Sequence, residues 1–378
     1  MTNPHRPRLV LYAQTHHSRE GEPISLLPLL QSNARRVTHL IVAAVHLNDN
    51  AALTLNDDPD TAPKFDQLWS EVADLQASGV PVLALLGGAA KGSYARLETE
   101  FERYYSVLAS FLRRHTLSGI DLDVEEQTSL QAIIRLIDHL RADFGPSFLI
   151  TLAPVLTALV PYKPHLSGFS YFALDAMRGA DIAWYNSQLY NGWGDASVAQ
   201  DFMLAIASGW DPRRVVLGLV TSPENGSGFV PLDRLGPVVA ALRAWCAAYP
   251  GITAGTEGFG GVMGWEYFNS HPEGRNAPWL WAETVGSMLA APILPPALPP
   301  PMGGRGQLAN ASAPFPGETG CCCAECYGWE RGARCGYVAG RVMELHVPNW
   351  VILGRYNTGI CSLRPPPPHL RPLSVSRR

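Results

Sequence analysis

The chain has 378 residues, of which 47% are hydrophobic and 16% charged, and its formal net charge is −4. This length allows two or three small domains or one large one, because an α/β barrel alone takes about 250 residues. The weak negative charge argues against a nucleic-acid-binding protein. The lack of an apolar run of about 18 residues argues against a membrane-spanning helix.

Eight short apolar runs follow one another through the first three quarters of the chain. They are rich in Val, Ile, Leu and Tyr. Their apolarity is continuous rather than alternating, which is typical of strands buried on both faces of a parallel sheet. We predict strands at residues 8–12, 37–47, 80–87, 119–125, 148–155, 181–190, 214–221 and 260–268.

Between these runs, apolar residues recur at spacings of three and four, which predicts amphipathic helices. We expect helices at residues 65–77, 96–114, 130–144, 198–208, 232–249 and 279–289. Eight strand-then-helix units predict an α/β fold of the (β/α)8 or TIM barrel type. An open doubly wound sheet is the alternative, but the count of eight and the lack of GxGxxG after the first strand argue against it.

The composition changes after the predicted barrel. Residues 292–301 read PILPPALPPP, which indicates a polyproline linker. Residues 302–378 hold nine Arg, no Lys and only four Glu, so this part is basic and the remainder acidic. We therefore predict a barrel over residues 1–291, a linker over 292–301 and a disordered tail over 302–378.

Six of the seven cysteines lie in this tail, at Cys321, Cys322, Cys323, Cys326, Cys335 and Cys361. Cys323 and Cys326 have CxxC spacing, but a zinc site needs four ligands, and Cys335 and His346 stand at unusual spacings. A small disulfide-stapled module, and translation of sequence not selected as protein, stay open beside disorder. We predict neither a cofactor nor a metal ion for this chain.

Three carboxylates alternate along the fourth predicted strand. Asp121, Asp123 and Glu125 are spaced by two, so in a strand they share one face. The series ends at the carboxyl end of the strand, where active sites of such barrels lie. Like charges on a buried face raise at least one pKa, which makes Glu125, nearest the mouth, the candidate proton donor. Glu126 should face away, and an ion-pair network or a metal site is the non-catalytic alternative.

The segment from Ser118 to Glu125 resembles the DGxDxDxE signature of family 18 glycoside hydrolases, with Ser118 in place of the first Asp. Three further segments resemble motifs of that family, the first two being typical of its plant and fungal class III type chitinases. They are Gln188-Leu189-Tyr190-Asn191, similar to QxYN, Gly261-Val262-Met263-Gly264-Trp265, similar to GVMxW, and Leu85-Leu86-Gly87-Gly88, similar to SxGG with Leu85 in place of Ser. The resemblance covers about residues 8–290.

The resemblance implies a retaining mechanism in which the substrate's own 2-acetamido group is the nucleophile, an exception to the two-carboxylate rule. Glu125 would protonate the leaving oxygen, Asp123 would orient the acetamido nitrogen, and Asp121 would share the proton of Asp123. Tyr190 would donate a hydrogen bond to the acetamido carbonyl. Gln188 and Asn191 would line the same wall, and Trp265 would form the floor under the sugar.

Several aromatic and histidine side chains have a plainer interpretation. Tyr190 and Trp265 could be ordinary core residues. Trp193 and Trp210 are either sugar platforms or packing residues. His16 and His17, after the first predicted strand, are most simply interpreted as solvated loop residues and are not assigned to the site.

The implied mechanism requires an N-acetyl group on the sugar whose bond is cut. This favours β-1,4-linked N-acetylglucosamine, in chitin or chito-oligosaccharides, with the N-glycan core as the alternative substrate of an endo-β-N-acetylglucosaminidase. A non-catalytic carbohydrate-binding relative is the third possibility. Residues 222–259 are too few for an added α+β subdomain, so we expect an open groove and endo cleavage.

The expected partner is thus a glycan rather than nucleic acid or a membrane, and we expect a monomer. No leader is evident at the amino terminus, so the chain as written should be cytoplasmic; it would be secreted if the true start lay upstream.

Overall fold

A computed structural model describes residues 6–31, 37–253 and 256–293, together with the backbone of four strands between residues 334 and 364. The chain divides into two compact units, Met1–Pro299 and Pro300–Arg378. The predicted boundaries at 291 and 301 stay predictions, because residues 294–301 lie outside the described part.

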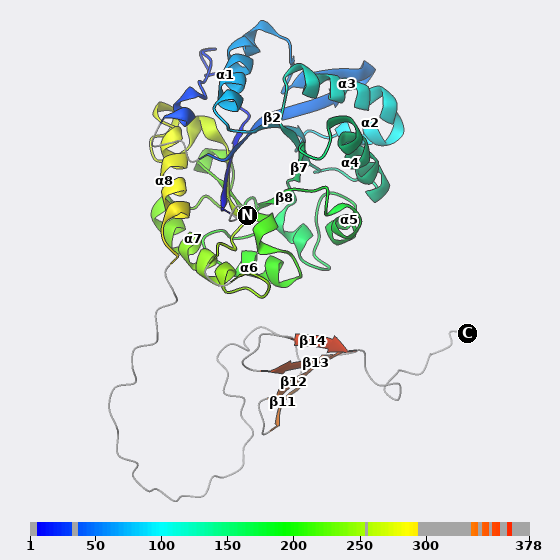
Figure 1. Cartoon of the computed structure of the whole chain (residues 1–378), viewed down its shortest axis with the longest axis vertical. Helices are drawn as coiled ribbons and strands as arrows, with labels where there is room; N and C mark the ends of the chain where they lie inside the picture. Colours follow the sequence, from blue (N-terminus) through cyan, green and yellow to red (C-terminus); the bar gives the residue numbers. More distant parts are fainter. Residues whose placement is uncertain are drawn as a thin grey trace, which may run out of the picture. The chain divides into compact units, whose positions relative to one another are not determined.

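Eight parallel strands form a closed barrel in the first unit (Figure 1). Strand β1 pairs with β10 on one side and with β2 on the other, which closes the ring. All eight predicted strands are confirmed, although most are shorter than predicted. They are β1 Arg8–Ala13, β2 His39–Asn48, β5 Val82–Gly87, β6 Gly119–Asp123, β7 Leu149–Leu152, β8 Trp184–Gln188, β9 Val215–Val220 and β10 Gly261–Trp265.

The α-helices surround the strands as an outer ring (Figure 1). They are α1 Asp66–Ala77, α2 Ser93–Thr99, α3 Phe101–Arg114, α4 Leu130–Phe144, α5 Tyr171–Arg178, α6 Gln200–Ala207, α7 Leu232–Ala247 and α8 Trp279–Ala290. All six predicted helices are present. The one predicted at 96–114 is divided at Glu100, whose φ/ψ of −131°/55° is not helical. Helix α5 was not predicted.

Short 3-10 helices and an added hairpin complete the barrel. The 3-10 helices are η1 Leu27–Leu30, η2 Asp49–Ala51, η3 Pro63–Phe65, η4 Leu156–Leu159, η5 Pro212–Arg214, η6 Pro223–Asn225, η7 Tyr267–Asn269 and η8 Gly274–Asn276. Strands β3 Ala52–Leu55 and β4 Asp58–Pro59 extend β2 by antiparallel pairing. In the described residues between β1 and β2, η1 stands where the regular pattern predicts an α-helix.

Two apolar layers explain why the barrel strands are continuously apolar. One layer lies between the strands and the helices and includes Leu11, Val42 and Leu86. The other fills the barrel interior with residues of opposite parity, such as Val10 and Ile41. Alternate side chains of a strand point to opposite faces, so burial of both faces requires apolar residues at nearly every position.

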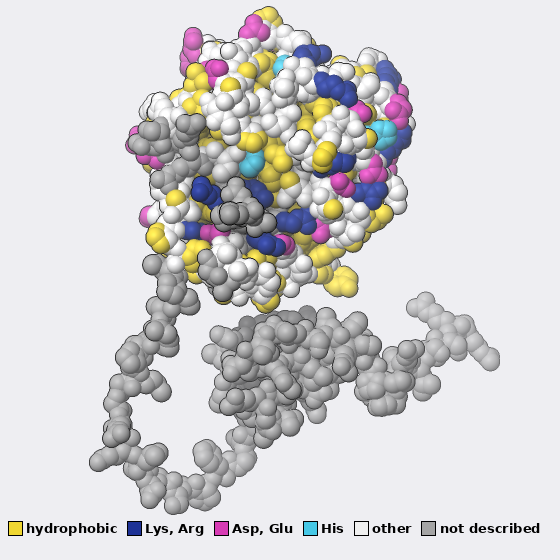
Figure 2. All heavy atoms as spheres, viewed as in Figure 1, with side chains coloured by type: hydrophobic (Ala, Val, Ile, Leu, Met, Phe, Trp, Pro, Cys, Tyr) yellow, Lys and Arg dark blue, Asp and Glu magenta, His cyan; other side chains and the backbone are white. Residues whose placement is uncertain are grey.

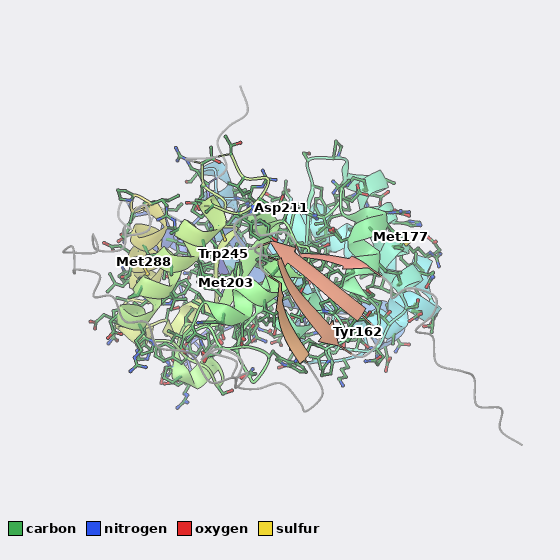
Figure 3. All side chains as sticks on the ribbon, turned by 90° about the horizontal axis from the view of Figure 1, so that it is seen from below. Tyr162, Met177, Met203, Asp211, Trp245 and Met288 are labelled. Atoms are coloured by element: carbon green, nitrogen blue, oxygen red, sulfur yellow. The ribbon has the colours of Figure 1, made fainter. Side chains whose placement is uncertain are left out.

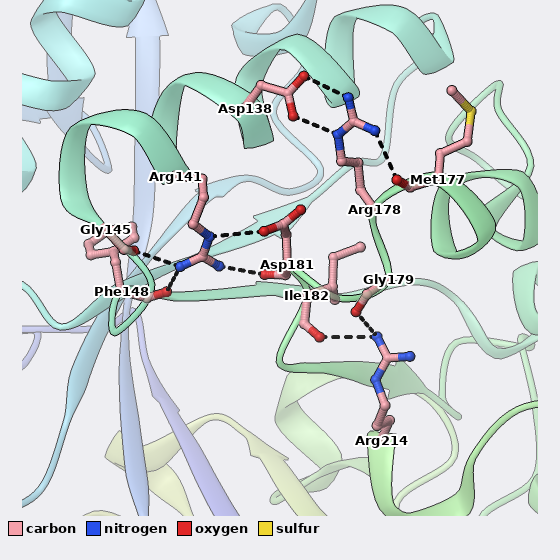
Figure 4. A network of polar contacts seen from close by, with 10 residues as sticks. All are labelled: Asp138, Arg141, Gly145, Phe148, Met177, Arg178, Gly179, Asp181, Ile182 and Arg214. Atoms are coloured by element: carbon pink, nitrogen blue, oxygen red, sulfur yellow. Dashed lines mark hydrogen bonds and ion pairs between the residues drawn. The ribbon is translucent and has the colours of Figure 1, made fainter.

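Polar contacts at the amino end of the barrel hold its helices to the strands. Figure 3 shows the barrel from the side, with Asp211, just before β9, above Tyr162, in the loop after β7. At the amino end, Arg141 donates to the carbonyls of Gly145 and Phe148 and to Asp181 (Figure 4). These contacts hold α4 to the segments that lead into β7 and β8.

The second unit contains an antiparallel sheet in the order β11-β12-β13-β14, formed by Arg334–Val338, Val342–Val347, Trp350–Arg355 and Cys361–Arg364. The disorder predicted for the tail concerns residues that, apart from these strands, lie outside the described part. The cysteine side chains also lie outside it, so neither the zinc site nor the disulfides are tested. No helix in the described residues has the length and apolarity of a membrane span.

Candidate active site

A pocket of about 360 Å³ lies at the carboxyl ends of the barrel strands. It is lined by residues from the ends of β2, β5, β6, β8 and β10 and from the loops that follow β1, β5, β6 and β8. These residues are Gln14, Ala44, His46, Leu85, Gly87, Gly88, Ala89, Ala90, Asp123, Glu125, Gln188, Tyr190, Asn191 and Trp265. Six of the seven predicted site residues line this pocket, and the seventh, Asp121, is not among its lining residues.

Asp121 is fully buried below the pocket and accepts three side-chain hydrogen bonds. The donors are the Tyr12 hydroxyl at 2.7 Å, the Thr151 hydroxyl at 2.5 Å and the Asn186 amide at 3.1 Å. Burial raises the pKa of Asp121, and the three donors partly oppose this rise because they favour the charged form. Of the three carboxyls, Asp121 therefore has the most hydrogen-bond donors to stabilise its ionised form.

The sequence analysis missed all three donors. Thr151 and Asn186 are fully buried polar residues inside strands β7 and β8, and Tyr12 has the same parity as the inward-facing Val10. A buried polar residue of inward parity was the signal that could have found them. Which carboxylate they contact depends on the stagger between strands that are distant in the sequence.

Asp123 and Glu125 share one donor. The side-chain amide nitrogen of Gln188 lies 3.1 Å from Asp123 Oδ1, 3.3 Å from Glu125 Oε1 and 2.9 Å from the Ala153 carbonyl oxygen. Burial and then the charges of Glu125 and Asp121 raise the pKa of Asp123 well above its usual value. Burial also raises the pKa of Glu125, against the opposing effects of Gln188 and Lys91. The two carboxyls thus titrate as a pair that retains a proton to higher pH than isolated acids do.

The predicted position of Glu125 inside the strand is wrong: β6 ends at Asp123, and Glu125 lies two residues beyond its end. It is half-buried, whereas Asp121 and Asp123 are buried. The series therefore runs from the barrel interior to the mouth, with Glu125 as the carboxyl most open to an entering molecule. This position suits a group that exchanges a proton with a ligand.

Tyr190, Asn191 and Trp265 line the same pocket as the carboxyls. Tyr190 is 7% exposed, and burial raises the pKa of its hydroxyl well above 10, so the hydroxyl is a neutral donor. The ring of Trp265 lies 5.5 Å from that of Tyr12. Asn191 has a φ of 54°, and its side-chain oxygen accepts the Ser227 amide at 2.9 Å. Asn191 therefore also ties the loop after β8 to the loop after β9.

The glycine pair after β5 has a structural reason. Gly87 has a φ of 96°, and a Cβ at this position would lie 2.4 Å from the carbonyl oxygen of Asp123. The Gly88 amide donates to that same oxygen at 2.9 Å. A larger residue at position 87 would push β5 away from the segment that carries the acids. Leu85, in place of the Ser of the SxGG motif, packs with the apolar barrel interior.

Two further residues in or beside the pocket have unusual polar surroundings. The Nδ1 atom of His46 is buried and has no hydrogen-bond partner among the described residues, and burial lowers the pKa of this ring. Beside the pocket, Glu266 accepts the backbone amides of Gln14 and Thr15, both at 2.8 Å, and thereby fixes the loop after β1. Neither His46 nor Glu266 was assigned to the site from the sequence.

The plainer interpretation applies to both tryptophans. Trp210 is buried and donates to the Leu159 carbonyl at 2.9 Å, and Trp193 is half-buried against the main core. The expectation of two solvated histidines is wrong for His16, which is 7% exposed and contacts the Ala43 carbonyl oxygen at 3.0 Å. Burial lowers the pKa of His16 to about 4, because its ring fills the space between the β1 loop and β2.

A second pocket of about 530 Å³ adjoins the first and shares Gln14 and Trp265 with it. It contains charged groups from three loops, among them Arg19, Glu224 and Arg275. The two pockets thus meet at Gln14 and Trp265, and Glu125 lines only the first of them. No three His, Cys, Asp or Glu side chains in the described part of the chain are grouped so that they could hold a metal ion.

Comparison with known proteins identifies the family. The model of "Glycosyl hydrolases family 18" matches residues 8–226. Endochitinase 37 from Trichoderma harzianum is 26% identical over 180 residues, which are 44% of this chain and 52% of that protein. The chain thus spans about half the length of this curated relative.

Two solved structures are more similar. A fungal endo-beta-N-acetylglucosaminidase from glycosyl hydrolase family 18 is 44% identical, with a TM-score of 0.70 over 75% of this chain and 98% of that one. The chitinase ChiC from Aspergillus fumigatus is 49% identical, with a TM-score of 0.66 over 73% of this chain and 97% of that one. With the signature carboxylates gathered in one pocket, this chain belongs to family 18 of the glycosyl hydrolases.

Proposed function

We propose that this protein is a retaining glycosidase that cleaves β-1,4 bonds between N-acetylglucosamine units, in chitin or chito-oligosaccharides, by substrate assistance. The observation that carries the proposal is the one-sided arrangement of the acids. Within the described residues, the carboxylates that line the central pocket are Asp123 and Glu125, and both come from the end of β6. The facing residues are Gln14, Tyr190 and Trp265.

This arrangement bears on the identity of the nucleophile. A retaining enzyme of the two-carboxylate type needs one acid on each side of the scissile bond, about 5–5.5 Å apart. Here the two acids lie on the same wall, and both accept a hydrogen bond from the side-chain amide of Gln188. The nucleophile then has to come from the substrate, and the carbonyl oxygen of a 2-acetamido group can reach the anomeric carbon from its own ring.

The proposed roles follow from the positions. Glu125, at the mouth, gives its proton to the leaving oxygen, which acquires that proton as the glycosidic bond breaks. The acetamido oxygen forms the new bond to the anomeric carbon, and Asp123 accepts the acetamido N–H. Water then opens the oxazolinium ion, and Glu125 takes back a proton. Asp121, held by three donors, supplies the negative charge that keeps the proton on the outer pair.

The side walls would hold the reacting sugar in place. The neutral hydroxyl of Tyr190 is available to donate to the acetamido carbonyl, and Trp265 offers an aromatic face to the sugar ring. Gln188 keeps Asp123 and Glu125 at their separation, and Asn191 holds the adjoining loop. Positioning of this kind lowers the barrier because the reacting groups no longer search for their geometry.

The second candidate function is that of an endo-β-N-acetylglucosaminidase on N-glycans. The specific observation in its favour is the 44% identity to a fungal enzyme with that title. The same acids would cut the bond between the two core N-acetylglucosamine units. The two functions differ in the sugar next to the one that Trp265 would hold, which would be N-acetylglucosamine for chitin and mannose for an N-glycan.

Product analysis on chitohexaose and on a high-mannose glycopeptide separates the two. Release of shorter chito-oligosaccharides from the first supports the chitinase function, and release of a glycan from the second supports the alternative. The Glu125→Gln variant is the control, and equal rates for it and the native protein would refute the role of Glu125. Binding of either substrate without turnover by the native protein would indicate a non-catalytic carbohydrate-binding protein.

A further inference from the structure

Glu126 directly follows the proposed acid and has no part in the pocket. Its side chain is 8% exposed and turns away from the acid series, as the sequence predicts. The Gly92 amide donates to both carboxylate oxygens, at 3.0 and 2.9 Å, and the Tyr94 amide donates to Oε1 at 2.9 Å. A buried carboxylate that accepts backbone N–H groups makes short, charge-assisted hydrogen bonds and fixes the backbone that it binds.

The backbone held in this way is a wall of the pocket. Residues 88–92 follow β5, and Gly88, Ala89 and Ala90 line the pocket. The loop begins with the hydrogen bond from the Gly88 amide to the Asp123 carbonyl oxygen and ends with the bonds to Glu126. Both ends are therefore attached to the four-residue segment 123–126 that also carries Glu125.

We propose that Glu126 is a positioning residue, whose carboxylate holds the loop 88–92 against the segment of the catalytic acid and so fixes both Lys91 and the wall beside Glu125. The inference rests on the proposed role of Glu125 as the proton donor. The leaving sugar has to lie next to Glu125, and the loop 88–92 lines the pocket beside that position. Displacement of the loop would therefore disturb the acid and the leaving sugar rather than the floor at Trp265.

Lys91 makes the effect measurable. Its charge lowers the pKa of Glu125 and opposes the rise caused by burial. The other titratable groups that interact with these carboxyls are Asp121 and Asp123 from β6, Tyr12 from β1, Tyr94 from α2, Tyr171 from α5 and Tyr190 after β8. None of these belongs to the loop 88–92. Release of the loop would thus remove the effect of Lys91 and leave the other charges in place.

The test is the pH dependence of kcat/KM for chitohexaose hydrolysis by the full chain. Glu125 acts in its protonated form, so activity falls as pH rises through its pKa, and the alkaline limb reports that pKa. Glu126→Gln keeps the size of the side chain but turns an amide N–H toward a backbone N–H. We expect kcat/KM to fall about tenfold and the alkaline limb to move up by about half a pH unit.

Lys91→Met should move the alkaline limb in the same direction by a similar amount. In the double variant, the shifts from Glu126→Gln and Lys91→Met should not add, because each substitution takes the positive charge of Lys91 away from Glu125, the first by releasing the loop and the second by removing the ammonium group. Glu98→Gln is the matched control. Its carboxylate accepts hydrogen bonds from Thr128 Oγ1 at 3.1 Å and from the Ser129 amide at 3.4 Å, so it ties α2 to the residues just after the segment 123–126 without holding the loop 88–92. Its alkaline limb should stay in place.

If Glu126 had only a structural role, Glu126→Gln would lower Tm and leave the alkaline limb of the pH profile unchanged. That result would overturn the proposal. Additive shifts in the double variant would overturn it as well. If Glu126→Gln does not fold, Glu126→Asp replaces it, because the shorter side chain holds the carboxylate farther from the loop. The same shift of the alkaline limb is expected for that variant. Full activity of Glu125→Gln would instead refute the proposed function, so the two failures are distinguishable.

Discussion

The charged side chains at the two ends of the barrel have opposite surroundings. At the amino end, the charged groups of Figure 4 are paired: Arg178 lies 2.6 Å from Asp138, and Arg141 lies 3.2 Å from Asp181. At the carboxyl end, Asp121, Asp123 and Glu125 crowd together, and neutral donors contact them in place of a Lys or Arg. On the face shown in Figure 2, dark blue and magenta side chains lie close together in several places.

The difference separates groups that hold the fold from groups that perform chemistry. Paired charges near the surface lower the free energy of the folded state only modestly. Crowded, buried carboxyls raise each other's pKa and cost stability, and such perturbed groups concentrate at functional sites. The four predictions below test this contrast, from the largest expected effect to the smallest.

The first prediction concerns the outer carboxyl. Glu125→Gln removes the proposed proton donor and should lower kcat on chito-oligosaccharides by about 10²–10⁴-fold, the usual contribution of a positioned general acid. Tm should stay the same or rise, because one of the crowded charges is gone. Steady-state kinetics and thermal unfolding of the same preparation check both parts. A large fall in Tm would place Glu125 among the fold-holding groups instead.

The second prediction concerns the inner carboxyl of the pair. Asp123→Asn should lower kcat by about 10²-fold, because the acetamido group loses its orienting acceptor. The pKa of Asp123 is raised in the folded state, so the folded protein keeps a proton that the unfolded chain has released. The native protein therefore loses stability as pH rises through this interval. Denaturant unfolding from pH 4 to pH 8 should show a weaker decline for Asp123→Asn, and equal declines would contradict the sign of the shift.

The third prediction moves to the amino end. Arg141→Ala removes hydrogen bonds to Gly145, Phe148 and Asp181 and should destabilise the protein by about 2 kcal/mol. The kcat/KM of the folded variant should remain that of the native protein, because this network lies at the end of the barrel opposite the pocket. Urea unfolding and kinetics at a temperature well below Tm measure the two quantities. A tenfold loss of kcat/KM in the folded variant would break the separation between the two ends.

The fourth prediction concerns His46, whose buried Nδ1 has no hydrogen-bond partner among the described residues. His46→Leu removes an unsatisfied buried group and should stabilise the protein by about 1 kcal/mol. The ring lines the pocket, so KM should rise a few-fold while kcat changes little. Thermal unfolding and initial rates over a range of substrate concentrations check this. Lower stability of the variant would show that the ring contributes more by packing than its unpaired nitrogen costs.

The sequence alone determined the repeated strand pattern and the face on which the acids lie. The period of two along a strand is a local property, so Asp121, Asp123 and Glu125 could be placed on one side, and Glu126 on the other, without any tertiary information. The continuous apolarity of the strands predicted burial on both faces, and the motifs around Tyr190 and Trp265 marked two further walls. Helix boundaries were less certain, as the break at Glu100 and the missed α5 show.

The tertiary structure alone decided which groups meet. Tyr12, Thr151 and Asn186 contact Asp121 from three other strands, and Gln188 bridges Asp123 and Glu125 from 65 and 63 positions away. These contacts depend on the stagger and closure of the barrel, which no local periodicity encodes. For the same reason, the sequence could say only that Glu126 faces away from the acids. The fold supplies the backbone amides of the loop 88–92 as its partners.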